Sequence, residues 1–153
     1  MKTIEQTHKS GLDLALWLPR LNIALAVVGL IDSFYLTWIK VAHTPAFCGG
    51  VGGCEAVNNS AYSQINGLPI ALLGMGAYLA MLGLMWAERV GGSWGEWSLL
   101  GVFGLSLVGT LYSTYLTYIE IAVLRAICPY CVLSAIAITL IFIVSVIRLR
   151  QTT

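Results

Sequence analysis

Charged residues are scarce in this chain. Lys and Arg number 8 and Asp and Glu number 7, which together make 10% of the 153 residues, against about 25% in an ordinary soluble domain. The net charge of +1, without any basic run, excludes a protein that binds nucleic acid through its charge. With 58% hydrophobic residues and a mean hydropathy of +0.85, the composition indicates a membrane protein. The length suits a single integral membrane domain over residues 1–153.

The N-terminal segment lacks the features of a cleaved signal peptide. Its first 16 residues are mixed and polar, whereas a signal peptide has a basic start, a short apolar core and a small-residue cleavage site. The first apolar run, from Leu18 to Ile39, is long enough to cross a bilayer. We therefore interpret this run as a retained membrane anchor.

Long apolar runs predict four membrane-spanning helices, each of which needs about 20 mostly apolar residues. The segments that qualify lie at about 18–41, 68–87, 97–120 and 127–148. Pro19 and Pro69 fall near the first turns of two of these helices, where a missing N–H costs little. The expected fold is an all-α membrane protein. It is a four-helix bundle with an extracytoplasmic loop, which carries a short helix, between the first two spans.

The distribution of Lys and Arg predicts the orientation of the bundle, because these residues gather on the cytoplasmic side. Six lie on the N-terminal side, namely Lys2, Lys9, Arg20, Arg89, Arg148 and Arg150. Only Lys40 and Arg125 lie on the opposite side. We expect a protein of the inner (cytoplasmic) membrane with both termini in the cytoplasm. The 43–67 loop and the 121–127 connection then face outward.

The two halves of the chain share a repeated segment. Residues 29–41 read GLIDSFYLTWIKV and residues 109–121 read GTLYSTYLTYIEI, at an offset of 80. A cysteine follows eleven residues after the shared threonine in both halves, and it begins a close pair each time. These pairs are Cys48/Cys54, separated by four glycines and Val51, and Cys128/Cys131, separated by Pro-Tyr. A duplicated hairpin that brings two cysteine pairs to one side of a membrane indicates electron transfer.

The four cysteines could also form a zinc site or purely structural disulfides. In the cytosol their spacing would fit zinc, but no histidine supports a metal site, since His8 lies on the other side and His43 stands alone. We expect no metal, because disulfides form and persist outside the cytosol. A non-enzymatic membrane scaffold with structural disulfides is the alternative of another class. It predicts that Cys131→Ala leaves thiol oxidation intact.

The two cysteine pairs differ in the chemistry that their surroundings favour. Cys128 and Cys131 open the last helix, where the helix dipole and free N–H groups favour a thiolate at Cys128. Cys131 lies one turn deeper, at the lipid boundary, where it can meet a lipid-soluble oxidant. The glycine-rich linker lets the Cys48/Cys54 pair open and close. Together they predict a relay in which the loop pair exchanges with a soluble partner and then with the helix pair.

Three polar residues carry further interpretations. Ser60, or Asn59 beside it, could cap a short helix in the loop. Asp32 lies about 10 Å inside the first span at 1.5 Å per residue. A carboxylate there is costly, and both a proton-transfer role and a packing role are open.

The ordered motifs resemble those of the vitamin K epoxide reductase family, over about residues 18–148. They are Cys-x5-Cys, Ser60 six residues later, and Cys-Pro-Tyr-Cys at the head of the last span. The resemblance implies that Cys128 and Cys131 are the active-site pair, with Cys131 facing a bound quinone of menaquinone, ubiquinone or vitamin K type. It implies that Cys48 and Cys54 shuttle electrons, with Cys54 bonding transiently to Cys128. Ser60 corresponds to the family's loop Ser/Thr and joins the expected catalytic residues.

The implied function is quinone-dependent thiol-disulfide oxidation. Electrons would pass from a thioredoxin-like extracytoplasmic protein through the two cysteine pairs to a membrane quinone, which supports disulfide-bond formation. The chain stops at Thr153, so we expect this partner to be a separate protein. An alternative is a quinone or quinone-epoxide reductase, for which the reduced quinone is the physiological product.

Overall fold

Four long helices build the molecule. The computed structural model describes residues 2–50 and 52–153, and the side chains of residues 11, 13–50 and 52–153. Val51 and the side chains of Lys2, His8 and Lys9, on which the sequence interpretation drew, lie outside these ranges. The long helices are α1 (Lys2–Val41), α3 (Ile70–Val90), α4 (Trp94–Tyr118) and α5 (Pro129–Thr152).

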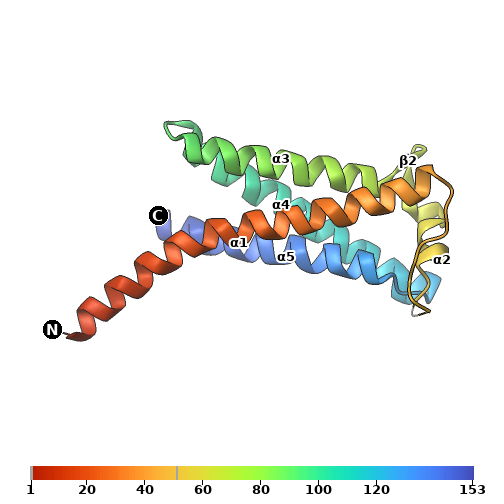
Figure 1. Cartoon of the computed structure of the whole chain (residues 1–153), viewed down its shortest axis with the longest axis horizontal. Coiled ribbons are helices and arrows are strands. Elements are labelled where there is room, and N and C mark those ends of the chain that lie inside the picture. The colour runs from red at the N-terminus through yellow and green to blue at the C-terminus, as the bar shows by residue number, and fades with distance from the viewer. Residues whose placement is uncertain (1, 51) are drawn as a thin grey trace.

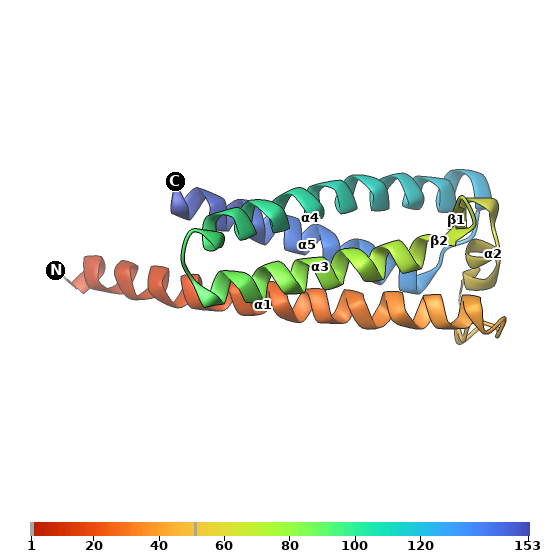
Figure 2. The same cartoon turned by 90° about the horizontal axis from the view of Figure 1, so that it is seen from above.

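The long helices form an antiparallel bundle in which each packs against two others (Figures 1 and 2). Helix α1 contacts α3 and α5, and α4 contacts the same two helices. Each is long and apolar enough to cross a membrane, over Asp13–Val41, Ile70–Val90, Trp94–Leu124 and Pro129–Thr152. The predicted all-α fold with four spanning helices is confirmed.

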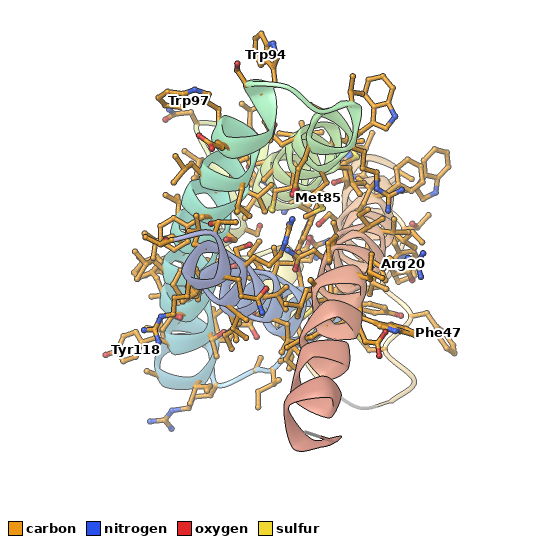
Figure 3. The ribbon with its side chains drawn as sticks, turned by 90° about the vertical axis from the view of Figure 1, so that its left-hand side faces the viewer. Arg20, Phe47, Met85, Trp94, Trp97 and Tyr118 are labelled. Atoms are coloured by element: carbon orange, nitrogen blue, oxygen red, sulfur yellow. A yellow bond between two sulfur atoms is a disulfide. The ribbon has the colours of Figure 1, made fainter. Side chains whose placement is uncertain are left out.

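The outer surface of the bundle carries many large apolar side chains. Met85 is 3% exposed and lies between the helices, whereas Trp94 and Trp97 are 74% and 73% exposed and point away from them (Figure 3). In water this surface would favour association, because exposed apolar area is unfavourable. In a bilayer it is the surface that a spanning helix presents to lipid.

Helix α1 is much longer than the sequence predicted. It begins at Lys2 rather than near residue 18, and its first turns extend beyond the bundle (Figure 2). Pro19 therefore lies inside the helix and not in its first turn, which corrects the prediction. The difference arises because hydropathy detects only the segment suited to lipid. The less apolar residues before it continue the same helix.

The segment between α1 and α3 holds the short elements of the fold. Helix α2 covers Cys54–Asn58, and a 3-10 turn, η1, covers Ala61–Ser63. Strands β1 (Gln64–Ile65) and β2 (Leu68–Pro69) form a two-residue antiparallel hairpin. Asn66 and Gly67 form its turn with φ of 52° and 84°, the conformation that Asn-Gly favours. The short helix was expected in this loop, whereas the hairpin was not.

The segment before α5 is also structured. Helix α4 continues into η2 (Ile119–Leu124), a π-helical turn, and residues 125–128 then lead to α5 without regular secondary structure. Helix α2, the hairpin and the start of α5 all lie at one end of the bundle (Figures 1 and 2). Helix α1 begins and α5 ends at the opposite end. The duplicated segments thus bring both cysteine pairs to the same end.

Candidate active site

The first cysteine pair lies in the loop after α1. Cys48 and Cys54 form a disulfide, with their Cα atoms 6.3 Å apart. Gly49, Gly50 and Gly52 between them have φ of 61°, 78° and 98°, a region that residues with side chains rarely adopt. Glycine is therefore required here for the shape of the small ring as well as for its flexibility.

The glycine-rich loop packs tightly on the chain that leads to Cys128. The N–H of Gly53 donates a hydrogen bond to the carbonyl oxygen of Ile127 at 2.9 Å. A Cβ added to Gly52 would lie 2.5 Å from that oxygen, and one added to Gly53 would lie 2.5 Å from the Cβ of Ala126. The missing side chains allow this approach, which sets the first cysteine pair beside the second.

The four cysteines meet in one packed cluster. Cys54 and Cys128 are each 1% exposed and form its centre with Val57. Cys48 and Cys131 pack against its edge. The four cysteines that the sequence selected are thus neighbours, although 80 residues separate the two pairs.

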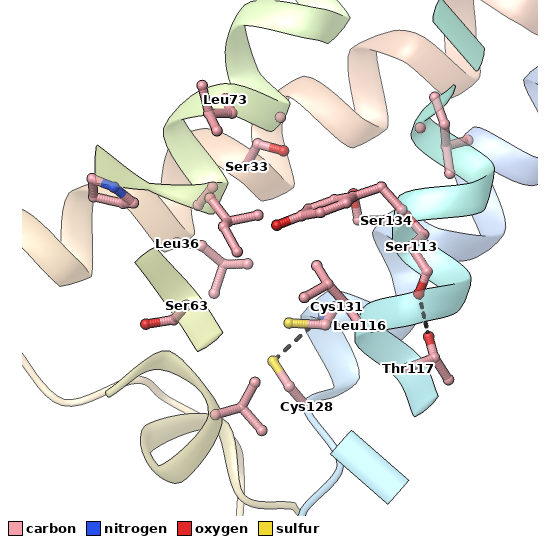
Figure 4. A pocket seen from close by; sticks show the side chains of 18 of the residues that line it. Ser33, Leu36, Ser63, Leu73, Ser113, Leu116, Thr117, Cys128, Cys131 and Ser134 are labelled. Carbon is pink, nitrogen blue, oxygen red and sulfur yellow. Dashed lines mark hydrogen bonds between the residues drawn. The ribbon is translucent and has the colours of Figure 1, made fainter. Parts of the chain in front are cut away.

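The second pair opens helix α5. Cys128 is the N-cap residue and Pro129 occupies the first turn, where its missing N–H needs no partner. The N–H of Cys131 donates to Sγ of Cys128 at 3.4 Å (Figure 4), and both thiols are free. Hydrogen bonds from the Cys131 thiol, and then from backbone N–H groups, hold the pKa of Cys128 below its ordinary value. Cys128 is thus the sulfur more readily present as a thiolate.

Glu120 contacts the second pair, and the sequence interpretation missed it. Its side chain is 4% exposed, and Oε2 accepts a hydrogen bond from the N–H of Cys128 at 3.2 Å. The π-helical turn η2 places it there, and the left-handed Arg125 (φ 50°) turns the chain back toward Cys128.

The signal for Glu120 was present in the duplicated segment. Glu120 occupies the position of Lys40 in the first copy, 80 residues earlier. Lys40 Nζ donates to the carbonyl oxygen of Asn58 at the end of α2, and to Oγ of Ser63 at 2.7 Å. Each copy therefore ends in a charged residue that holds a segment next to a cysteine pair. One charge is basic and the other acidic.

Tyr130, between the two cysteines of the second pair, also holds the loop. Its hydroxyl donates to the carbonyl oxygen of Phe47 at 2.7 Å, and the N–H of Phe47 donates to the Tyr35 hydroxyl at 3.3 Å. The rings of Tyr35 and Tyr130 lie 5.1 Å apart. The residue before Cys48 is thereby fixed to both α1 and α5.

Ser60 lies near the pairs but does not use its side chain as a cap. It precedes η1, and its hydroxyl donates to the carbonyl oxygen of Val57 at 2.7 Å. Asn59 follows the end of α2 rather than preceding a helix. The expected capping role is therefore wrong, because α2 begins earlier, at Cys54.

A cavity of about 390 Å³ opens beside the second pair, among α1, α3, α4 and α5. Cys128 and Cys131 line it together with aliphatic side chains such as Leu36 and Leu116 (Figure 4). Ser60 lines it on the loop side. Its size and apolar walls suit a small ring compound. In the part of the chain whose side chains are described, no group of three His, Cys, Asp or Glu residues could hold a metal ion.

Comparison with known proteins identifies the family of the chain. A relative, the thiol-disulfide oxidoreductase LTO1 of Arabidopsis thaliana, is 31% identical over 126 residues. The matched region is 76% of this chain but only 33% of the relative, so the chain spans about a third of that protein's length. The model of the vitamin K epoxide reductase family matches residues 20–146, which include all four cysteines and nearly the whole bundle. The chain therefore belongs to the vitamin K epoxide reductase family.

Proposed function

We propose that this membrane oxidoreductase passes electrons from a thioredoxin-like extracytoplasmic protein to a membrane quinone, and so supports disulfide-bond formation. The single observation that carries the proposal is the shared packing of Cys54 and Cys128 in one buried cluster. The Cys48–Cys54 disulfide beside two free thiols on α5 argues against a scaffold whose cysteines only brace the fold. The thiol-disulfide oxidoreductase named among its relatives supports the same chemistry.

The proposed electron path runs through two exchanges. The partner's dithiol reduces the Cys48–Cys54 disulfide, so that the partner gains a disulfide and the loop gains two thiols. The Cys54 thiolate then attacks Sγ of Cys128 in an oxidised Cys128–Cys131 pair, forming a Cys54–Cys128 bond and releasing Cys131. Cys48 attacks Cys54, which re-forms the loop disulfide and releases Cys128. Two electrons now reside on the α5 pair. This state, with a loop disulfide and two free thiols on α5, is the one that the structure has.

The cavity beside Cys131 fits a quinone ring. Its aliphatic walls, including Leu36 and Leu116, would bind the ring's faces, and Cys131 lies at its wall. A quinone supplies an acceptor for the two electrons and two protons of the Cys128/Cys131 pair. Cys54 and Cys128 are each 1% exposed, so water has little access to the centre of the cysteine cluster. Ser60 is proposed to support the loop at the cavity's edge.

The proposed orientation places the cysteines outside the cytoplasm. Arg20, Arg89 and Arg148 gather around one end of α1, α3 and α5, where they line a second cavity. Among the Lys and Arg residues whose side chains the structure describes, only Lys40, in the last turn of α1, and Arg125, after η2, lie toward the cysteine end. Because Lys and Arg favour the cytoplasmic side, the cysteine end would face outward, where a disulfide persists.

Turnover by the purified protein in lipid nanodiscs tests the proposal. Reduced thioredoxin serves as the protein donor, and menadione or a short-chain ubiquinone serves as the acceptor. We expect quinone reduction to require all four cysteines, so that changing Cys48, Cys54, Cys128 or Cys131 to Ala abolishes it. Turnover that persists in Cys131→Ala would contradict the proposal and favour the scaffold reading.

A further inference from the structure

One buried carboxyl group in the bundle has no partner. Asp32 of α1 is 4% exposed, and neither of its carboxyl oxygens has a hydrogen-bond partner in the described part of the chain. A buried carboxyl that has no role is normally paired or absent, since an unpaired polar group in an apolar interior is unfavourable. Asp32 lines the cavity that Cys128 and Cys131 also line. An occupant of that cavity would supply the missing partner.

The helices are built to bring Asp32 beside other polar groups. One turn before it, Gly29 lies against the ring of Tyr78, where an added Cβ would lie 2.2 Å from Cζ. Helices α1 and α3 therefore approach as closely as the Tyr78 ring allows. The Tyr78 hydroxyl bonds to the carbonyl oxygen and Oγ of Ser134, both at 3.1 Å. Tyr78 and Ser134 line the same cavity as Asp32.

Ser134 lies one helical turn inward from the reactive sulfur of Cys131. Ser134 follows Cys131 by three residues, so it shares its face of α5 and lies about 4.5 Å further along the axis. Figure 4 shows Ser134 and Cys131 on the cavity side of this helix, opposite Leu36 of α1. A flat ring of quinone size that rests against Cys131 would therefore extend toward Asp32. The Tyr78 hydroxyl is already engaged by Ser134, whereas the buried carboxyl of Asp32 has no partner among the described residues.

We propose that Asp32 hydrogen-bonds and protonates an oxygen of the quinone that accepts electrons from Cys131. The proposal rests on the proposed function, because it needs a quinone in this cavity. A carboxyl without charged neighbours or hydrogen-bond donors is most stable in its neutral form, and a neutral carboxyl donates a hydrogen bond to a carbonyl oxygen.

The atoms balance with the two thiols as the source of protons. Oxidation of Cys128 and Cys131 to a disulfide releases two electrons and two protons. Asp32 gives its proton to the acceptor's oxygen and takes up one of the protons that the thiols release, so it ends unchanged. The second thiol proton goes to the other oxygen of the acceptor.

Two variants of Asp32 test the proposal. Asp32→Asn keeps the shape and a hydrogen-bond donor but cannot give up a proton, and Asp32→Leu removes both functions. We expect quinone reduction to fall about 100-fold or more in both, the range for a lost general acid. The matched control is Asn22→Ala. Asn22 is also fully buried on α1 without a partner among the described residues, but it does not line the cavity.

Quinone binding gives a readout that is independent of turnover. In a Cys131→Ser background, the rise in melting temperature caused by menadione reports its affinity. We expect Asp32→Leu to weaken binding about tenfold, the loss of one hydrogen bond, and Asp32→Asn and Asn22→Ala to bind as the parent does. If Asp32→Asn and Asp32→Leu reduce and bind quinone like the parent, the role of Asp32 is refuted while the proposed function stands. If the wild-type protein reduces no quinone, the proposed function itself fails.

Discussion

Cys128 and Cys131 are one helical turn apart, yet their surroundings make them unequal. Cys128 receives hydrogen bonds from the thiol and the N–H of Cys131. These bonds stabilise the negative charge of a thiolate. Both cysteines line the cavity, and Cys128 also lies in the buried cluster with Cys54, so the proposed exchange with the loop pair would take place at Cys128.

The pH dependence of alkylation tests this difference. Because the folded pKa of Cys128 is lowered, its thiolate is present above that pKa and its reactivity is lost only as pH falls through it. With iodoacetamide, we expect Cys128 to remain reactive at a pH below the ordinary thiol value of about 8.5. Mass spectrometry of the separate peptides measures this rate. In Cys131→Ala, the main donor is gone and the profile should move to higher pH. An unchanged profile would contradict the assignment.

Glu120 is expected to hold Cys128 in place. Glu120→Ala leaves the buried N–H of Cys128 without an acceptor, which costs about 1–3 kcal/mol of the free energy of unfolding. It should also slow exchange between the two pairs, because Cys128 is no longer fixed next to Cys54. Thermal unfolding and the rate of exchange measure the two effects. Glu120→Gln keeps an acceptor oxygen and is the control. Equal losses in both variants would show that charge, rather than the hydrogen bond, matters here.

At the scale of elements, the glycine-rich loop depends on two separate properties of glycine. Gly53 has an ordinary φ of −106°, so its need for glycine comes from the close approach to Ala126. Gly50 has a φ of 78° with nothing near its Cβ position, so its need is conformational. A side chain at Gly53 would therefore disturb the contact with the segment before α5, whereas one at Gly50 would disturb only the shape of the loop.

Trapping the bond between the two pairs distinguishes these properties. In a Cys48→Ser/Cys131→Ser background, only Cys54 and Cys128 remain, and we expect them to form a disulfide. Gly53→Ala should reduce the trapped fraction, because its Cβ forces the loop away from Ala126 at an overpacking cost of about 1–3 kcal/mol. Gly50→Ala should strain the loop by about 1–2 kcal/mol and leave the trapped fraction high. A gel-shift assay of free thiols measures the fraction of chains with the Cys54–Cys128 disulfide. Similar fractions in both variants would argue against a role for the contact between Gly53 and Ala126.

Much of the element structure followed from the sequence. Hydropathy located the four spans because a lipid-facing helix must be apolar along its length. The offset repeat brought both cysteine pairs to one end. Hydropathy could not find the polar first turns of α1, so Pro19 was misplaced in the helix.

The contacts within the site were harder to predict. The π-helical turn that aims Glu120 at Cys128 has no clear sequence signature, and a charged residue near a span end looks interfacial. The link from Tyr130 to Phe47 joins residues 83 positions apart and depends on how the loop folds over α5. Such contacts arise only when the whole bundle has formed. The match of Glu120 with Lys40 in the two repeats, however, marks Glu120 as a candidate for such a contact.

At the scale of the whole molecule, the duplicated hairpin brings both cysteine pairs to one end of the bundle (Figures 1 and 2). Its loop disulfide lies at the end of the bundle and its second pair lies at a cavity among the helices. We therefore predict a fixed order of electron transfer from the loop pair to the α5 pair to the quinone. The loop pair reaches the quinone only through Cys128 and Cys131.

Counting the quinone reduced by the prereduced protein tests this order most directly. After removal of the reductant, the four thiols of each chain can form two disulfides. The wild type should therefore reduce two equivalents of menadione. Cys48→Ser/Cys54→Ser, which keeps only the α5 pair, should reduce one equivalent. Cys131→Ala, which keeps the loop pair, should reduce none. If Cys131→Ala still reduces an equivalent of quinone, the loop pair reaches the acceptor without the α5 pair, and the relay is wrong.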